Sequence, residues 1–348
     1  MVVIDLEPSE LAPLEFSNRS RPRILCSGEL GQCLAIKRPF LGFLQIKELN
    51  TGEWRLEMRM TIKPPHPLKI FCLTMTESKH VYLPLVRDEL LLLDRNLMFH
   101  LSSSHRFKSA AVQYWLREFE RVSRNINPIM TAYEGAVGRQ PTRLEFQLEL
   151  VKAHDRLRLL YPHKNIIEHS SAVSGQLFDA LSSKRSRQLE EIEFLRQNAS
   201  VAAHRPSDKE LMPRIRQVLD AAGAAGLLRH SLVHIALISC LAENRHGDKP
   251  SSGRRVIKPR PDYTERHAHN AVSDVHLLEF LIASNAYPFG PVALCTMDEG
   301  LAQFWIELRV SHSSRSESND INFRFTIDKR LFPRLSEGQL EEVRQATN

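Results

Sequence analysis

The 348-residue chain is predicted to be an α/β protein, with a parallel sheet flanked by helices, a large helical insertion and a small N-terminal antiparallel β domain. Two features of the hydrophobic pattern predict this class: a change in its period along the chain, and a pair of continuous apolar runs. Apolar residues alternate with polar ones up to about residue 85, and they recur with a helical period over about 104–245. Two continuous apolar runs, at 90–93 and 292–295, are typical of parallel strands that are buried on both faces.

The first 84 residues are expected to form the antiparallel β domain, after an irregular arm over 1–20. Along 53–62, Trp54, Leu56, Met58 and Met60 alternate with charged residues, so one face of this strand should be buried. The tripeptide "NTG" at 50–52 predicts a hairpin. Further strands are expected at 23–27, 32–37, 40–49, 68–75 and 80–85.

Residues 85–310 are expected to form the main domain, with a helical insertion at about 140–230. Thr142, followed three residues later by Glu145, predicts a capped helix start. The remainder, 311–348, should contain a mobile polar segment (311–320), a short strand ("INFRFTI") and a last helix near 335–346. Other helices are expected at 109–122, 141–161, 171–181, 186–199, 209–226, 229–244, 268–286 and 301–308.

The composition argues against several classes of protein. With 42% hydrophobic and 25% charged residues it is ordinary for a globular protein. No run approaches 18 apolar residues and the first residues lack a basic segment, so neither a membrane span nor a signal peptide is expected. The five cysteines (Cys26, Cys33, Cys72, Cys240, Cys295) are scattered, which favours reduced thiols in the cytoplasm.

The net charge of +6 mildly favours a polyanionic partner, and the positive charge is concentrated in two places. One is "KRSR" at 184–187. The other is a Pro/Gly/Ser-rich loop predicted over 246–261, which either grips phosphates beside an active site or is a solvated linker. Its basic residues are Lys249, Arg254, Arg255, Lys258 and Arg260.

Carboxylates are placed where a parallel sheet would bring them together. Asp94 ends the first apolar run and Asp298 follows the second, so both should emerge at one sheet edge. Asp274, near an expected helix start, and Glu134, beside a short helix after Pro128, can face the same cleft. Clustered carboxylates raise one another's pKa unless a hard cation binds them, which favours Mg²⁺ or Mn²⁺. Such a site can activate water for attack on a phosphodiester.

Each candidate also has a purely structural interpretation. Asp94 can form an Asx turn, Asp298 and Asp274 can cap helices, and Asn96 can cap a helix or position a ligand. Glu243, which ends an apolar helix, is the alternative to Glu134 as second acid. The His230/His234 and His267/His269 pairs are interpreted as surface or core residues, because neither occurs in a metal-site motif.

Three motifs resemble those of PIN domains. "LLLLDRNLMFHL" is similar to the family's opening strand, with Asp94 and Asn96 in the Asp-x-Asn positions. "SDVHLLEFL" resembles its third acidic motif, with Asp274, and "VALCTMDEGLAQFW" resembles its Thr-x-Asp turn and closing helix, with Thr296 and Asp298. The resemblance covers about 85–135 and 225–310. About 140 residues separate Glu134 from Asp274, which departs from the usual compact domain and requires the insertion.

The resemblance implies a metal-dependent endoribonuclease with RNA as substrate. Asp94, Glu134, Asp274 and Asp298 would hold Mg²⁺ or Mn²⁺, while Asn96 and Thr296 would position the cluster. Such proteins act as toxins, in defence or in RNA turnover, and the N-terminal β domain would select a substrate, an inhibitor or another protein partner. The alternative is a catalytically inactive PIN-derived scaffold that binds nucleic acid or protein.

Overall fold

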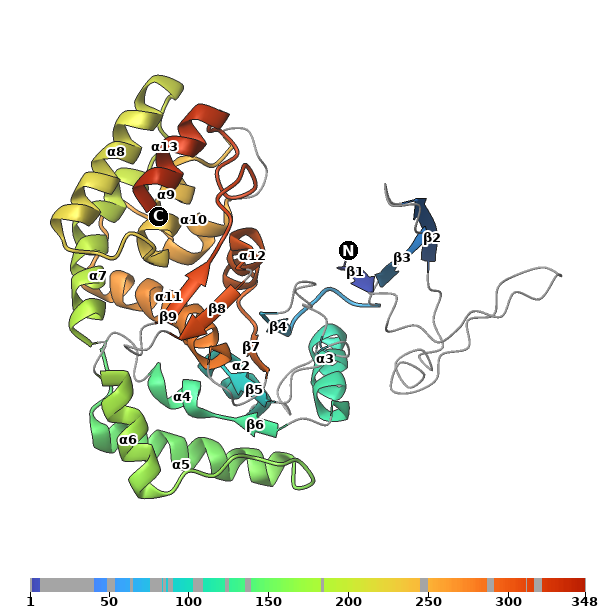
Figure 1. Cartoon of the computed structure of the whole chain (residues 1–348). Helices are drawn as coiled ribbons and strands as arrows, with labels where there is room; N and C mark the ends of the chain where they lie inside the picture. The colour runs from blue at the N-terminus through green and yellow to red at the C-terminus, as the bar shows by residue number, and fades with distance from the viewer. Residues whose placement is uncertain are drawn as a thin grey trace, which may run out of the picture.

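The computed structural model is mixed α/β (Figure 1). Side chains are not described before residue 65, so the predicted burial of one face of 53–62 lies outside the described part. The following predictions also fall on residues outside it: the strands at 23–27, 32–37 and most of 80–85, the turn at 50–52, and the thiols of Cys26 and Cys33. The described residues are 2–6, 41–48, 54–62, 65–75, 83, 86, 90–102, 109–122, 125–134, 139–182, 185–244, 250–286, 291–310, 312–315 and 321–347.

The N-terminal strands form an antiparallel sheet, as predicted. Strands β1 (Val2–Leu6), β2 (Leu41–Glu48) and β3 (Trp54–Ile62) pair in the order β1-β3-β2, with Glu48 opposite Trp54. The expectation of an irregular arm over 1–20 is wrong for β1. Its five residues alternate little in polarity, so the periodicity on which strand prediction rests is missing there.

A second, four-stranded sheet has the order β4-β7-β5-β6. Strands β5 (Leu90–Leu93), β6 (Asn125–Asn127) and β7 (Val292–Thr296) are parallel, and β5 lies between the other two. Strand β4 (Phe71–Leu73) pairs antiparallel with β7. The segment 68–75, which we assigned to the N-terminal sheet, therefore belongs to the central one. A strand's own residues specify its faces and not its partner.

Both faces of the central sheet are buried, which explains the continuous apolar runs. Leu91 and Leu93 point into one hydrophobic cluster with helices α2 (Arg95–Ser102) and α3 (Ala110–Arg121). Leu92 points into the other, with α9 (Leu232–Leu241) and α11 (Glu265–Asn285). Every residue of α9 is buried, as expected for a helix that is apolar all round.

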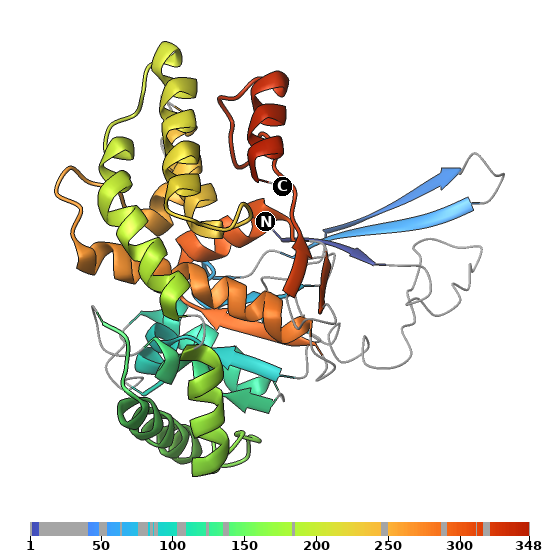
Figure 2. The same ribbon diagram turned by 60° about the vertical axis from the view of Figure 1, so that its left-hand side comes forward.

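The predicted insertion is helical. It contains α5 (Arg143–Leu160), α6 (Ser171–Ser182), α7 (Arg185–Asn198), a 3₁₀ turn η4 (Ala199–Ala202) and α8 (Asp208–Ala224), and it follows the short helix α4 (Ile129–Tyr133). The predicted capping box is confirmed, because Glu145 N–H donates to Thr142 Oγ1 and the Glu145 carboxylate accepts from Thr142 N–H. Helices α5 and α6 lie at one end of the molecule, α7 runs beside α11, and α8 reaches towards the opposite end (Figures 1 and 2).

Two loop assignments are wrong. The segment 246–261 contains helix α10 (Ser252–Ile257), which Ser251 caps, and α10 packs against α9 and α12 (Glu299–Leu308). The polar segment 311–320 contains strand β8 (His312–Arg315), which pairs antiparallel with β9 (Ile321–Arg324). Composition indicated mobility in both, but tertiary contacts override such local preference. The last helix, α13 (Glu337–Thr347), is where it was predicted.

Candidate functional site

The predicted pairing of the two aspartate-bearing strands is confirmed. Strands β5 and β7 are parallel neighbours, with Leu93 opposite Cys295, and Asp94 N–H continues the pairing to Cys295 O at 3.1 Å. The chain leaves β5 towards β6 on one side, whereas β7 lies on the other. This reversal of strand order is the place where open α/β sheets bind ligands, beyond the carboxyl ends of the strands.

Further hydrogen bonds hold the Asp94 carbonyl and carboxylate in place. It caps α2, because its carbonyl accepts from Met98 N–H at 3.0 Å and its Oδ1 accepts from Leu97 N–H at 2.5 Å. The Thr296 hydroxyl donates to its Oδ2. The side chain is thus fixed and only 2% of Asp94 is exposed. The structural interpretation of Asp94 was an Asx turn, and the structure shows instead a cap on α2, which places the carboxylate at the sheet edge.

Thr296 connects the two aspartates. It is fully buried, and its Oγ1 accepts from Asp298 N–H at 2.9 Å while the hydroxyl donates to Asp94. Asp298 caps α12 through its Oδ1, which accepts from Leu301 N–H at 2.8 Å. Its Oδ2 lies 3.9 Å from Lys258 Nζ. The expected positioning role of Thr296 has a geometric basis in these bonds.

Glu134 and Asp274 reach the same place from two helices. Glu134 follows α4, as predicted, and its Oε1 accepts from Arg95 N–H at the start of α2, 2.9 Å away. Asp274 lies in the middle of α11 and not near its start, which Thr264 caps. The prediction of a helix start at Asp274 is wrong because the apolar run at 275–278 begins inside a longer amphipathic helix.

Three of these carboxylates line one pocket of about 370 Å³. Asp94 lies beside it and interacts electrostatically with all three. Asn96 is exposed and lines the pocket. Arg95 Nη1 and His269 Nε2 are buried atoms of pocket residues that have no hydrogen-bond partner in the described part of the chain. The lining residues are Arg95, Asn96, Phe99, Glu134, Lys258, His269, Asn270, Ser273, Asp274 and Asp298.

The pocket carries excess negative charge. Burial, and then the charge of Asp298, raises the pKa of Asp94 to about 6. Burial, and then the charges of Asp298 and Asp94, raises the pKa of Asp274 to about 7, although Lys258 opposes this. Burial and the nearby Asp94 raise the pKa of Glu134 well above its usual value. Carboxylates perturbed in this way are typical of functional sites.

A tighter group of possible metal ligands lies elsewhere, and the sequence did not indicate it. Glu191, His276 and Glu279 bring one ligand atom each within 4.8 Å of the others, and no other three Asp, Glu, His or Cys residues do so in the described ranges. Arg187 Nη2 contacts Glu279 at 2.8 Å and Glu191 at 3.4 Å, and His276 Nε2 contacts Glu191. Arg187 and Glu191 are neighbours on α7, and His276 and Glu279 are neighbours on α11, but no sequence spacing relates the two helices.

The arginine already supplies a cation to this group. Burial acts to lower the pKa of His276, but hydrogen bonding to Glu191 and the charges of Glu279 and Glu191 outweigh it and the pKa is raised. Burial acts to raise the pKa of Glu191, but the hydrogen bond and charge of His276, with Arg187, outweigh it and the pKa is lowered. The group is therefore a self-neutralising ion-pair network that joins α7 to α11.

The stabilisation by His276 should depend on pH. Because its folded-state pKa is raised, the contribution is full below the unfolded pKa of about 6.5 and is lost as pH rises through the folded value. We expect His276→Gln to reduce the free energy of unfolding more at pH 6 than at pH 9, as measured by urea unfolding. The exposed His204→Gln should change it little at either pH. An equal effect of His276→Gln at both values would contradict this assignment.

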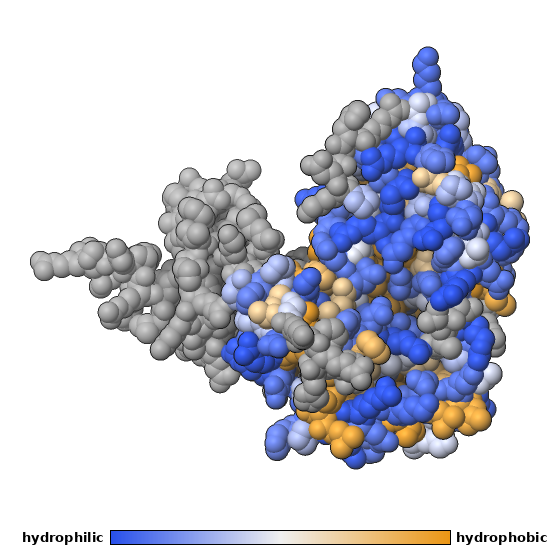
Figure 3. All heavy atoms as spheres, turned by 180° about the vertical axis from the view of Figure 1, so that it is seen from behind, coloured by the Kyte–Doolittle hydropathy of each residue, from blue (hydrophilic) through white to orange (hydrophobic). Residues whose placement is uncertain are grey.

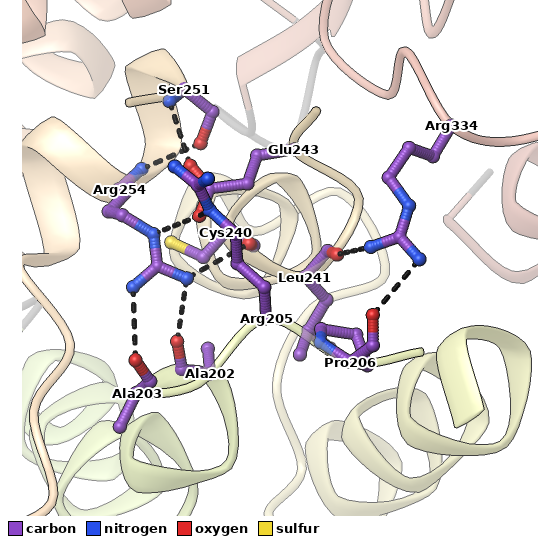
Figure 4. A network of polar contacts seen from close by, with 10 residues as sticks. All are labelled: Ala202, Ala203, Arg205, Pro206, Cys240, Leu241, Glu243, Ser251, Arg254 and Arg334. Carbon is purple, nitrogen blue, oxygen red and sulfur yellow. Dashed lines mark hydrogen bonds and ion pairs between the residues drawn. The ribbon is translucent and has the colours of Figure 1, made fainter. Parts of the chain in front are cut away.

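Arg254, for which we predicted a phosphate contact, makes its described contacts inside the protein, and the phosphate contact stays a prediction. Its side chain is 17% exposed and pairs with Glu243, which is 2% exposed (Figure 4). Its Nη2 also donates to Ala202 O at 2.8 Å and to Cys240 O at 3.4 Å. The buried carboxylate of Glu243, which follows α9, pairs with this side chain, and the composition of 246–261 does not reveal this contact. Arg254 therefore holds α9, α10 and η4 together.

The other basic residues of 246–261 differ in their surroundings. Arg255 pairs with Glu299 at 2.8 Å. Lys258 is 58% exposed, lines the acidic pocket, and ends α10 with φ +53°. Arg260 is exposed, and Lys249 lies outside the described residues. Lys258 is thus the member of this set that the structure places at the site.

Glu243 does not lie in the acidic pocket. Its Oε1 contacts Arg205 at 2.8 Å, and its Oε2 accepts from Ser251 N–H at 3.1 Å (Figure 4). The preference for Glu134 over Glu243 is therefore consistent with the positions of both. His234 is a core residue, 2% exposed, and the His230 ring packs edge-on against Phe323 at 5.2 Å.

The cysteines of the described region are buried thiols, as expected. These are Cys72, Cys240 and Cys295, and Cys72 lies directly opposite Cys295 across β4 and β7. Among the helices that the structure describes, none is both long and apolar enough to span a bilayer. Comparison of the chain with protein-family models, with curated proteins and with solved structures finds no match.

Proposed function

We propose that the chain is a PIN-like, Mg²⁺- or Mn²⁺-dependent endoribonuclease that hydrolyses RNA phosphodiester bonds. The observation that carries this proposal is the meeting of Asp94, Glu134, Asp274 and Asp298 at the carboxyl edge of a parallel sheet, where the pKa values of Asp94, Glu134 and Asp274 are raised. These carboxylates come from four separate segments. A fold that holds them together without neutralising them favours a cation as their ligand.

The donor set fits a hard divalent cation. All four side chains offer oxygen. The ammonium group of Lys258 lies 3.9 Å from Asp298 and opposes the rise in the pKa of Asp274. The oxygens of no three of the four lie within 4.8 Å of one another in the described structure. Mg²⁺ keeps several of its waters and is held through one or two carboxylates, so a looser group of acids suits it. Asp274, Asp298 and Glu134 line the pocket and, with Asp94 beside them, would hold the ion.

When bound, the ion would supply activation of water and stabilisation of the leaving oxygen. The chain's own residues prepare the site. Thr296 fixes the Asp94 carboxylate, and the start of α2 directs Arg95 N–H to Glu134. Arg95 Nη1 and Lys258 Nζ offer positive charge to a phosphate at the pocket mouth, and Asn96 offers an amide. Contacts of this kind position a polyanion without selecting its sequence.

One observation favours the alternative, a catalytically inactive scaffold derived from such a nuclease. The acidic oxygens are not gathered as tightly as those of Glu191, His276 and Glu279. A scaffold would bind RNA or protein through the same face without cleaving RNA. Under either proposal the N-terminal β sheet is the candidate surface for an inhibitor or another protein partner, and action in the cytoplasm, as a toxin, in defence or in RNA turnover, remains the proposed setting.

A cleavage assay separates the two. We expect the purified full chain to cleave single-stranded and structured RNA with Mg²⁺ or Mn²⁺ and to stop when a chelator is added. Binding of RNA without cleavage, at every divalent ion tested, would support the scaffold and contradict the nuclease.

The charge of Lys258 should affect RNA affinity and not turnover. Asparagine tolerates the left-handed backbone at this position, so Lys258→Asn removes the charge without adding strain. We expect weaker RNA binding, with the slope of log K against log salt falling by up to about one unit. Turnover at saturating RNA should change much less than KM. Lys329→Asn, which removes an exposed lysine outside the pocket lining, is the matched control. An unchanged salt slope in Lys258→Asn would remove Lys258 from the RNA interface.

A further inference from the structure

Helix α5 is apolar on two opposite faces. On the inner face, Phe146, Leu150 and Leu157 are at most 4% exposed and pack into the two hydrophobic clusters. On the outer face four large apolar side chains are open. Leu144 is 65% exposed, Leu148 49%, Val151 57% and Leu159 84%. A surface helix normally has one apolar stripe, so the second one indicates a binding surface.

The outer side chains form one stripe, here called the α5 stripe (Leu144, Leu148, Val151 and Leu159), in which Asp155 is the charged residue between Val151 and Leu159. At 3.6 residues per turn they lie within about 80° of one another around the helix axis. A groove of about 330 Å³ runs beside the stripe and is walled by Ile167 and the start of α6. Figure 3 shows apolar residues gathered at the end of the molecule that α5 and α6 form. The stripe and groove share no residue with the acidic pocket.

Charges beside the stripe change sign halfway along the helix. Glu145 and Glu149 precede Lys152 and Arg156, and all four lie on the same flank of the stripe at helical spacing. When two such helices pack antiparallel about a twofold axis, each glutamate of one copy lies opposite a basic side chain of the other. Within one chain Glu149 pairs with Lys152 at 2.9 Å, and Glu145 pairs with Arg139. In the antiparallel pair of helices, Glu145 also comes to face Arg156 of the second copy and Glu149 comes to face its Lys152, with the same register for both pairs. The order of charges is therefore complementary to itself in the antiparallel direction.

We propose that the α5 stripe binds the same stripe of a second copy of this chain, with the two helices antiparallel about a twofold axis near Val151. A twofold contact uses one patch twice, so the patch must complement itself. The apolar side chains satisfy this requirement, because Leu144 of one copy approaches Leu159 of the partner subunit near each end. Asp155, which is 67% exposed within the stripe, lies opposite Gln147 of the partner subunit. In its own chain the Gln147 amide donates to Ser171 O at 3.2 Å and to Ser174 Oγ at 3.4 Å.

The mass of the full chain in solution tests this proposal. Light scattering after size-exclusion chromatography should give twice the chain mass for the unaltered protein at micromolar concentration and the single-chain mass for Val151→Glu. Leu189→Glu is the matched control, since Leu189 is a 54% exposed leucine on α7 and should leave the dimer intact. A single-chain mass for the unaltered protein, or a dimer that survives Val151→Glu, would overturn the proposal.

Reversing charges tests the register. Glu149→Lys places like charges near the axis and should weaken the dimer at least tenfold in Kd, whereas Glu149→Lys with Lys152→Glu should restore it. Both forms keep the helix composition nearly constant. Failure of the double variant to recover affinity would contradict the antiparallel pairing of Glu149 with Lys152.

Cross-linking tests the direction. Val151→Cys lies near the axis and should form a disulfide-linked dimer under mild oxidation. In Leu159→Cys the two cysteines of the dimer lie about 25 Å apart along the antiparallel helices, at 1.5 Å per residue. This variant should therefore form no disulfide-linked dimer. A mixture of Leu144→Cys and Leu159→Cys chains should cross-link with each other. Equal cross-linking of all single variants, or none with Val151→Cys, would rule out this geometry.

Discussion

Asp94→Asn should abolish metal-dependent RNA cleavage while leaving the fold intact. The substitution removes one charge from the acidic pocket but keeps an oxygen that can accept from Leu97 N–H, as Asp94 Oδ1 does. The Thr296 hydroxyl can rotate to accept from the new amide, so the β5–β7 edge should remain. We expect kcat to fall at least about 100-fold if the pocket holds the ion, because the loss of one group that stabilises charge in a transition state has an effect of this size.

The same variant should be more stable than the unaltered chain at neutral pH without metal. The folded-state pKa of Asp94 is raised to about 6, so its favourable contribution is full below the unfolded value of about 3.9 and is lost as pH rises through 6. Asn cannot ionise, so the gain in stability from the variant should grow between about pH 4 and 7. Thermal unfolding at several pH values measures this. Asp220→Asn, at an exposed position on α8, is the matched control.

Two results would contradict this part of the proposal. Full cleavage by Asp94→Asn would remove Asp94 from the reaction. The second is a gain in the free energy of unfolding, variant minus unaltered chain, that is smaller at pH 7 than at pH 5. It would mean that the hydrogen bonds of Asp94 outweigh its burial and its repulsion from Asp298.

Arg254→Ala should destabilise the fold by on the order of 3 kcal/mol, since removal of one partner of a buried ion pair leaves an uncompensated charge. Arg205 still contacts Glu243 in the variant, which places the effect at the lower end of the range for such losses. The carbonyls of Ala202 and Cys240 also lose a donor. Urea unfolding measures the loss, and RNA affinity per folded molecule should stay unchanged.

The matched control is Arg216→Ala, which breaks an exposed pair with Glu342 and should change stability much less. A double variant, Arg254→Met with Glu243→Gln, removes both charges and should recover most of the stability. If Arg254→Ala were as stable as the unaltered chain but bound RNA more weakly, the arginine would be a phosphate contact after all.

The residues at the carboxyl edge of the sheet could be predicted because their signal is local. A continuous apolar run marks a strand that is buried on both faces, and the polar residue that ends it marks the edge. Asp94 and Asp298 follow this rule, and β5 and β7 are parallel neighbours as predicted. Thr142 and Glu145 were predictable for the same reason, because a capping box is complete within four residues.

Features that depend on distant partners could not be predicted. Arg254 lies in a segment rich in Pro, Gly and Ser, yet Glu243 draws it into the interior. The sequence pattern of β4 indicates a strand but does not say that β7, more than 200 residues later, is its partner. Glu191 and His276 belong to different helices, and only their packing brings them together. The PIN-like character of the fold stays a prediction.

Binding of Mn²⁺ by the full chain is the measurement that tests most directly whether the acidic pocket is a metal centre. Isothermal titration at pH 7 should show Mn²⁺ binding with release of protons, because the raised pKa of Asp274, about 7, leaves part of that carboxyl protonated before the ion arrives. Asp94→Asn should weaken the binding at least tenfold, whereas Glu279→Gln, in the other carboxylate group, should not. Binding that is lost in Glu279→Gln but retained in Asp94→Asn, or no binding at all, would contradict the assignment.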